Sequence, residues 1–320
     1  MHSIALGIDM AKNSFQVALL RDGKLRHHTF PNTEPGFAQL QAWLAKHGVN
    51  HLHACMEATA AYGDALAHVL HQAGHRVSIV NPLRIKGFAQ SQLQRNKTDK
   101  LDATVIARFC ATQQPEAWTP LPAEIQHLQA LMRRLQALLE MRQQESNRLE
   151  QAGKQPVIGE SLNKMIATLD GEMARLRQLI NDHIDQHPDL KRDRELLLSI
   201  PGIGETTATW LLSEVQVKRY SSARQVAAHA GLTPRHHESG KRVGGRTPLS
   251  KTGNARLRRA LYLPAVVAKR HNPIIQAFCA RLQERGKRPL EIIGAAMRKL
   301  VHIVYGVLKS GKAFDPSFAS

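Results

Sequence analysis

The first 110 residues alternate short apolar runs with amphipathic stretches, a pattern typical of an α/β layer structure. Three apolar runs, SIALGID, FQVALLRDG and LRHHTF, predict consecutive strands, and Asp22-Gly23 predicts a hairpin turn between the second and the third. HLHACMEA and RVSIVNP predict two further strands, with a helix over 62–73 between them and Pro82 closing the last. Three meandering strands followed by β-α-β units give the strand order of the RNase H fold.

Residues 123–187 show helical periodicity alone. A breaker-rich segment, 152–156, separates two runs and predicts two long helices that fold back as an antiparallel coiled-coil hairpin. Two roles fit such a hairpin: a spacer that also dimerises, or a surface that contacts RNA. The apolar positions recur at spacings of three and four, and they are Leu128, Leu131, Leu135 and Leu138 in the first run and Leu162, Ile166, Leu169, Met173, Leu176, Ile180 and Ile184 in the second.

The remaining chain, from about Lys191, is predicted to be mostly helical except over 235–246, where glycines interrupt any helix. The fold class expected is therefore α/β plus α. The patterns divide the chain into an α/β domain of RNase H type at 1–120, the coiled-coil hairpin at 121–190 and a mostly helical C-terminal domain at 191–320.

Positive charge is concentrated in the C-terminal part of the chain. The formal net charge is +18, and residues 191–320 hold 24 Lys and Arg against 8 Asp and Glu, whereas residues 1–190 hold 20 against 18. Such an excess attracts a polyanion, and nucleic acid is the commonest one. No stretch approaches the roughly 18 to 20 apolar residues of a membrane span, and no signal peptide pattern opens the chain. The sequence thus predicts a cytoplasmic protein with no membrane partner.

The cysteines and histidines predict neither disulfides nor zinc. Cys55, Cys110 and Cys279 are far apart and odd in number, which argues against a disulfide framework and a zinc ribbon. They are expected to be buried thiols. None of the 17 His falls at a spacing that fits a zinc site.

Four acidic residues stand where strands or helices begin and end. Asp9 ends the first apolar strand and Glu57 ends the fourth, while Asp99 and Asp102 share one face if Thr98 caps a helix there. Clustered carboxylates repel one another unless a cation lies between them, and hard oxygen ligands select Mg²⁺ or Mn²⁺. Such a site supports phosphoryl transfer, and so DNA strand cleavage or strand transfer. One such Asp alone is commonly a cap, so the hypothesis rests on the four together.

Residues 199–208, SIPGIGETTA, predict a helix-hairpin-helix in which a Gly-rich turn joins two helices. Backbone N–H groups around Gly202 and Gly204 can then bind a phosphate without reading the base sequence. A plain turn between two helices is the alternative.

A Gly-rich basic segment further along the chain offers two candidate nucleophiles, Ser239 and Ser250. A Ser among Arg and Lys can attack a phosphodiester while the cations stabilise its alkoxide and the transition state. Each Ser also fits a turn or cap, and Ser250 is placed to precede a helix that begins near Asn254. The basic residues of this segment that we expect to bind nucleic acid are Lys241, Arg242, Arg246 and Lys251.

A basic helix follows, predicted to hold a phosphate-tracking face over an apolar face. Acidic residues are nearly absent from this part of the chain, which a solvated helix surface would not explain. The basic face comprises Arg256, Arg258, Arg259, Lys269 and Arg270, and the apolar face comprises Leu257, Leu261, Leu263 and Val266.

Together these motifs resemble one family, the DEDD-type transposases of bacterial insertion sequences, which are bridge-RNA-guided recombinases. The resemblance covers essentially the whole chain. It is carried, in order, by GIDMAK, CMEATAAYGD, VNPLRIKGFAQSQ, NKTDKLDA, SIPGIGETTA, AGLTPRHHESG, LSKTGNARLRRALY and AAMRKL.

The resemblance implies a RuvC-like N-terminal domain, a coiled coil and a C-terminal transposase domain. The family's four acids fall on the same four residues, and its nucleophilic serine falls on Ser239 in Glu-Ser-Gly, with Ser250 second. It further implies a covalent protein–DNA intermediate, Mg²⁺ supplied by the acids of a neighbouring protomer, and dimers or tetramers on a structured bridge RNA that pairs with donor and target DNA. The protein would be cytoplasmic and associated with the nucleoid.

Two other functions compete with this interpretation. A junction-resolving nuclease would use the same acids with water as nucleophile, which leaves the Glu-Ser-Gly segment without a role. A non-enzymatic nucleic-acid-binding module would leave four clustered carboxylates without a local basic partner, at an electrostatic cost.

Overall fold

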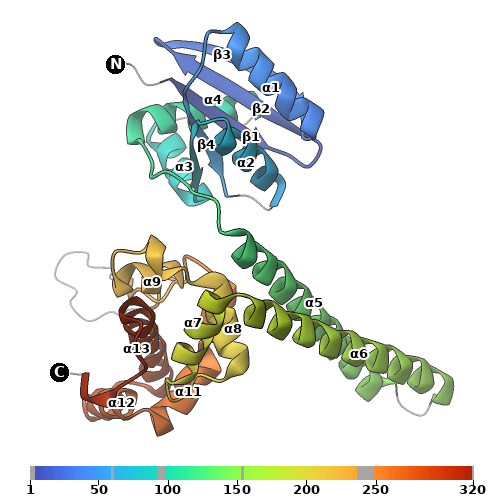
Figure 1. Cartoon of the computed structure of the whole chain (residues 1–320), viewed down its shortest axis with the longest axis vertical. Coiled ribbons are helices and arrows are strands. Elements are labelled where there is room, and N and C mark those ends of the chain that lie inside the picture. The colour runs from blue at the N-terminus through green and yellow to red at the C-terminus, as the bar shows by residue number, and fades with distance from the viewer. Residues whose placement is uncertain (1–3, 59–60, 93–98, 153–154, 236–247, 319–320) are drawn as a thin grey trace. The chain divides into compact units, whose positions relative to one another are not determined.

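A computed structural model describes residues 4–58, 61–92, 99–152, 155–235 and 248–318 (Figure 1). The chain forms two compact units, Met1–Leu121 and Pro122–Ser320. Four residues with a predicted function lie outside the described residues: the candidate nucleophile Ser239 and the basic residues Lys241, Arg242 and Arg246.

The N-terminal unit contains one five-stranded sheet in the order β3-β2-β1-β4-β5. The three predicted meandering strands are confirmed as antiparallel neighbours, while β4 pairs in parallel with β1, and β5 in parallel with β4. At the predicted hairpin turn, Asp22 and Gly23 have φ angles of 50° and 76°, the left-handed pair that a tight hairpin with right-handed strand twist requires. The strands are β1 (Ala5–Met10), β2 (Ser14–Arg21), β3 (Lys24–Pro31), β4 (His53–Glu57) and β5 (Arg76–Val80).

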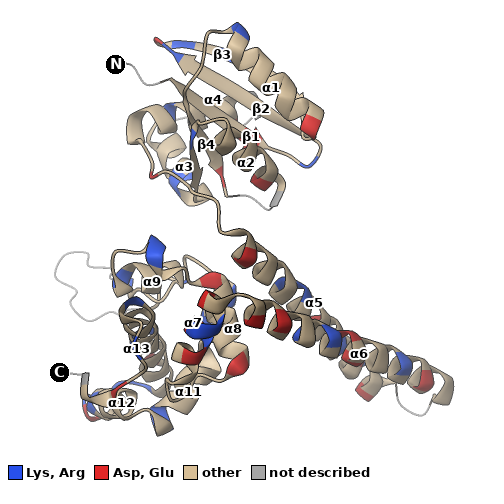
Figure 2. Ribbon diagram, in the orientation of Figure 1, with Lys and Arg blue, Asp and Glu red and all other residues tan. Residues whose placement is uncertain are grey.

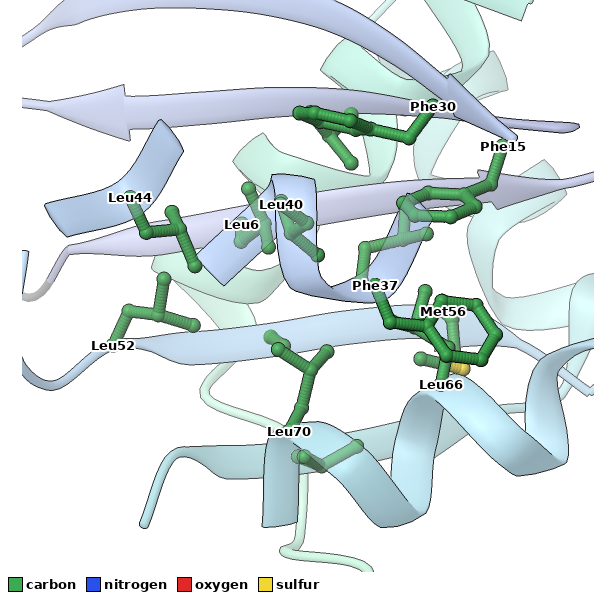
Figure 3. Packing of buried hydrophobic residues seen from close by; sticks show 14 of the residues in the cluster. Leu6, Phe15, Phe30, Phe37, Leu40, Leu44, Leu52, Met56, Leu66 and Leu70 are labelled. Carbon is green, nitrogen blue, oxygen red and sulfur yellow. The ribbon is translucent and has the colours of Figure 1, made fainter. Parts of the chain in front are cut away.

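Helices cover both faces of this sheet. Helices α1 (Glu34–Lys46) and α2 (Asp64–Gln72) pack on one face, in the apolar core that Figure 3 shows. Helices α3 (Pro82–Ser91) and α4 (Asp99–Gln113) pack on the other face. The helix expected over 62–73 is confirmed as a short 3₁₀ turn, Ala61–Gly63, followed by α2.

Helix α1 was not among the predicted elements. Its sequence signal is local, because Thr33 caps the helix by accepting a hydrogen bond from the Gly36 N–H and Pro35 occupies its first turn. Phe37 and Leu40, three residues apart, then bury its core face.

The predicted helical hairpin is confirmed, and α5 (Ala123–Gln151) and α6 (Pro156–Gln186) lie side by side (Figure 1). Arg142 of α5 donates from both Nε and Nη2 to the carboxylate of Asp170 on α6. Acidic and basic positions are interspersed along both helices, as Figure 2 shows. Most of the predicted core positions are buried, but Leu131, Leu162 and Ile166 are only half-buried. Met132, which was not predicted, is buried in place of Leu131.

The rest of the C-terminal unit is helical, with α13 in contact with α7, α9, α11 and α12. The fold as a whole is mixed α/β with one five-stranded sheet and a largely helical remainder. Among the described residues, none of the helices combines the length and apolarity that crossing a bilayer requires. The helices are α7 (Pro188–Leu198), α8 (Glu205–Glu214), α9 (Ala223–His229), α10 (Ala255–Ala260), α11 (Tyr262–His271), α12 (Pro273–Glu284) and α13 (Pro289–Ser310), with 3₁₀ turns at Val217–Arg219 and Pro316–Phe318.

The predicted basic helix is wrong in one respect, because it is two helices, α10 and α11, that separate at Leu261. Pro264 lacks the N–H that would bond the carbonyl four residues earlier, so one continuous helix is disfavoured. The predicted apolar face is also wrong at Leu263, which is 70% exposed because it lies two residues after the buried Leu261, on nearly the opposite side of the helix. Pro264, Ala265 and Ala268 are the buried residues of α11 instead.

Candidate active site

Strand register brings Asp9 and Glu57 to one edge of the sheet. Ile8 of β1 pairs in parallel with Met56 of β4, so the residues that follow them are neighbours. Side chains alternate along a strand, and Ile8 and Met56 belong to the core under α1 and α2. Asp9 and Glu57, both half-buried, therefore lie on the opposite face, which α3 and α4 cover.

Helix α4 brings Asp102 to the same edge. A Cβ on Gly7 would lie 2.1 Å from the Ala103 carbonyl oxygen, so only glycine permits this approach of helix to strand. Further along α4, the Cys110 thiol donates to the carbonyl oxygen of His53, at the start of β4, across 3.3 Å. The helix thus runs antiparallel to β1 and β4, with its first turn over their carboxyl ends.

The backbone therefore gathers the predicted acids at one edge. Asp102 is half-buried in the first turn of α4. Asp99 is the first residue of that helix, and the structure describes its backbone but not its side chain. A hydrogen bond of 2.8 Å between His27 Nε2 and Thr104 Oγ1 ties the same turn to β3.

The donor set of this edge fits a hard divalent cation, because carboxylate oxygens are the ligands that Mg²⁺ and Mn²⁺ prefer. Within the residues that the structure describes, no three His, Cys, Asp or Glu side chains are grouped closely enough to hold a metal ion. The side chain of Asp99 is not among the described side chains. Elsewhere in the chain, Cys55, Cys110 and Cys279 are buried free thiols, as predicted.

The predicted helix-hairpin-helix corresponds to α7, a turn over 199–204 and α8. Gly202 has a φ of 102°, and a Cβ there would lie 2.7 Å from Cβ of Ala268 on α11. Gly202 thus serves close packing of the turn onto α11. Gly204 is exposed, precedes the first residue of α8 and supplies no capping side chain, so it is the better placed of the two to approach a phosphate.

The segments that flank residues 236–247 pair with each other. Arg235 N–H donates to the Pro248 carbonyl oxygen at 2.8 Å, and Ser250 N–H donates to the Thr233 carbonyl oxygen at 2.8 Å. Ser250 is thus half-buried in a short antiparallel ladder. Lys251, exposed, follows it with a left-handed φ of 54°.

A half-buried polar network lies beside this ladder, and sequence reasoning missed it. Asn254 caps α10 by accepting from the Leu257 N–H at 3.0 Å, and its Nδ2 donates to Glu214 Oε2 at 2.6 Å. Its own N–H donates to the His229 carbonyl oxygen at 2.7 Å. The other oxygen of Glu214 is buried without a hydrogen-bond partner among the described residues. Burial lowers the pKa of His229, and the charge of Glu214 partly offsets that effect.

The predicted basic residues of α10 have different environments. Arg258 is half-buried and donates from Nη1 to the Ala230 carbonyl oxygen at 3.1 Å, next to the ladder. Arg256 and Arg259 are exposed and line a cleft of the C-terminal unit. These two, unlike Arg258, keep their guanidinium groups accessible to an anion.

Comparison with known proteins identifies the family. One family model, described as a transposase, matches residues 6–155, and a second, described as the transposase IS116/IS110/IS902 family, matches residues 194–280. A pilin gene-inverting protein of Moraxella lacunata is 35% identical over 319 residues, which cover 98% of each chain. The chain belongs to this transposase family. The predicted resemblance is confirmed.

Further relatives of this transposase have similar names. The pilin gene-inverting protein of Moraxella bovis is also 35% identical, with 98% of both chains covered. The transposase for insertion sequence element IS1328 of Yersinia enterocolitica is 28% identical, over 80% of this chain and 81% of its own. Family membership makes DNA the substrate and enzymatic DNA strand transfer the activity.

Proposed function

We propose that the protein is an RNA-guided DNA recombinase of a bacterial insertion sequence, with Ser239 as nucleophile and Asp9, Glu57, Asp99 and Asp102 as its metal-binding acids. The proposal is supported by strand register and by the contact between Gly7 and α4, which bring the backbone positions of these acids to one edge of the sheet. Because the family acts on DNA, the group on which these acids would act is a phosphodiester.

The acidic edge would hold Mg²⁺, or Mn²⁺, and a bound divalent ion would stabilise the negative charge that develops on the oxygens of a phosphodiester. The protein's own part is to hold the carboxylates in place. Register fixes Asp9 beside Glu57, and the approach of α4 to Gly7 fixes the turn that contains Asp102.

Ser239 would attack the phosphodiester. Its Oγ would form the new bond to phosphorus, the bond from phosphorus to a deoxyribose oxygen would break, and a proton would pass to that leaving oxygen. The segments on either side of 236–247 pair with each other, so the two ends of the stretch that contains Ser239 in sequence are held together. Ser250, tied into that ladder through its N–H, is the second candidate.

The remaining features of the proposal concern assembly. We place a RuvC-like domain of RNase H fold at 1–120, which the strand order supports, a coiled-coil hairpin at 121–190 and a C-terminal transposase domain at 191–320. A bridge RNA would pair with donor and target DNA, and dimers or tetramers would combine the acids of one protomer with the serine of another. The basic residues would then need to contact mainly phosphates, and the protein would act in the cytoplasm at the nucleoid.

The test is a covalent-trapping assay with the full chain, RNA from the non-coding end of the element, Mg²⁺ and labelled donor and target DNA. A DNA–protein adduct on a denaturing gel is expected, and Ser239→Ala should remove it while Ser250→Ala retains it. An adduct lost only in Ser250→Ala would transfer the role. Cleaved DNA without any adduct would mean that water is the nucleophile and that the protein is a junction-resolving nuclease.

A further inference from the structure

A cleft of about 380 Å³ opens in the C-terminal unit between the first half of α5, α8 and α10. Helix α10 contributes Arg256 and Arg259, and α8 contributes Trp210, which is only 8% exposed. The side of the cleft on α5 is formed by Arg133, Gln136, Ala137 and Glu140. The cleft thus joins a helix of the hairpin to the basic helix.

Three guanidinium groups line this cleft against one carboxylate. Glu140 accepts a hydrogen bond of 2.8 Å from Gln136 Nε2 and one of 3.2 Å from Arg259 Nη1. The hydrogen bond from Gln136, and then Arg259 and the charge of Arg256, lower the pKa of Glu140. The carboxylate of Glu140 therefore occupies a position that is already arranged to bind an oxyanion.

The ion pair between Glu140 and Arg259 does little to hold the two helices together. The side chains of Arg259 and Glu140 are 76% and 54% exposed, and a pair so exposed contributes little to stability because water and salt screen it. The pair can therefore open at small cost. A phosphodiester offers the same kind of anionic oxygens and, as part of a polymer, releases counterions when it binds.

We propose that this cleft binds the phosphodiester backbone of a nucleic acid through Arg133, Arg256 and Arg259, and that Glu140 is an internal competitor that the phosphate displaces. The inference rests on the proposed contact of nucleic acid with α10 and extends it to α5. Arg133 becomes a nucleic-acid-binding residue of the hairpin. Glu140 weakens binding until enough phosphate contacts form to replace it.

The experiment measures binding of the full chain to a fluorescent DNA duplex and to a single-stranded RNA of equal length across a series of salt concentrations. Arg133→Gln is paired with Arg134→Gln, because Arg134 is its exposed neighbour on α5 and does not line the cleft. Glu140→Gln is paired with Glu150→Gln, an exposed acid about three turns further along the same helix.

A plot of log affinity against log salt has a negative slope. Arg133→Gln should reduce the magnitude of that slope by about one, and Arg134→Gln should reduce it less. Glu140→Gln should raise affinity roughly twofold to fivefold at fixed salt, as expected for removal of a competing exposed pair, and Glu150→Gln should not. The probe that the wild-type chain binds more tightly, DNA or RNA, is the better ligand of the cleft. Either result supports the proposal, because both probes carry a phosphodiester backbone.

Equal slopes for Arg133→Gln and Arg134→Gln, or no gain in Glu140→Gln, would overturn the cleft proposal. Unfolding midpoints of all four variants should match the wild type, because all four side chains are exposed. Failure of the proposed function would look different, since the trapping assay would then yield no adduct with the wild-type chain, whatever its salt dependence.

Discussion

The two units place their functional residues by different means. In the N-terminal unit, backbone register and one glycine contact bring acids from β1, β4 and α4 to a single edge. In the C-terminal unit, basic residues are distributed over helix surfaces, and we propose that they act through their summed charge. We therefore expect recombination to require each acid of the edge, whereas replacing one exposed cation should cause only a partial loss of nucleic-acid affinity.

The largest expected effect is the loss of an acid. Asp9→Ala or Asp102→Ala should abolish recombination, because each removes a ligand of the proposed metal site, while RNA binding stays nearly intact. A recombination assay and an RNA-binding assay on the same preparation check this. Asp64→Ala, which removes an exposed acid at the start of α2, should remain active. Recombination by either edge variant would show that the edge is not catalytic.

The second effect tests the contact that positions α4. Gly7→Ala should destabilise the N-terminal unit by roughly 3 kcal/mol, because its Cβ would meet the Ala103 carbonyl oxygen at 2.1 Å and the helix must move. Gly87→Ala is the control, since a Cβ at Gly87 in α3 meets nothing within 4 Å and alanine favours a helix by up to about 1 kcal/mol. Thermal unfolding that ranks both variants alike would contradict this role of Gly7.

The third effect concerns the half-buried pair of Glu214 and Asn254 in the C-terminal unit, which should be sensitive to a single substitution, as the acidic edge is and the exposed cations are not. Asn254→Asp keeps the cap of α10 but places a carboxylate against Glu214, so it should cost roughly 2 kcal/mol. Adding Glu214→Gln should restore most of that loss, because the new amide can donate to the new carboxylate. Denaturant unfolding of the two single variants and the double variant measures the coupling. Additive effects would mean that the two side chains do not interact.

The smallest effect separates two neighbouring arginines. Arg258→Gln should lower the stability of the unit by about 1 kcal/mol through loss of its bond to the Ala230 carbonyl, with little change in the salt dependence of DNA binding. Arg256→Gln should do the reverse, lowering the salt slope by about one with an unchanged unfolding midpoint. Equal behaviour of the two variants would remove the distinction between structural and phosphate-binding arginines.

The sequence predicted much of the fold because its signals are local. Strand alternation, the Asp22-Gly23 turn and the spacing of Leu128 and Leu135 are all readable over a few residues. Thr33 and Pro35 offered the same kind of signal for α1, which was overlooked. Leu263 was wrong because it follows Leu261 by two residues and so lies on nearly the opposite side of a helix, whereas Ala265 and Ala268 continue the spacing of Leu257 and Leu261.

The placement of Asp9 and Glu57 at neighbouring strand ends was predictable, because the end of each apolar run is readable in the sequence. The contact between Glu214 and Asn254 was not predictable, because it joins residues 40 positions apart with no local pattern. The prediction of one basic face was wrong for Arg258, because residues two apart lie on different sides of a helix, and Arg258 donates to the Ala230 carbonyl oxygen while Arg256 is exposed.

The most direct test of the central claim is a titration of the full chain with Mn²⁺ followed by electron paramagnetic resonance, which detects binding without catalysis. The account predicts that the wild-type chain binds Mn²⁺, that Asp9→Asn and Asp102→Asn each weaken binding strongly, and that Asp64→Asn does not. Binding that is equal in all four proteins would contradict the claim that acids from β1, β4 and α4 form one metal site.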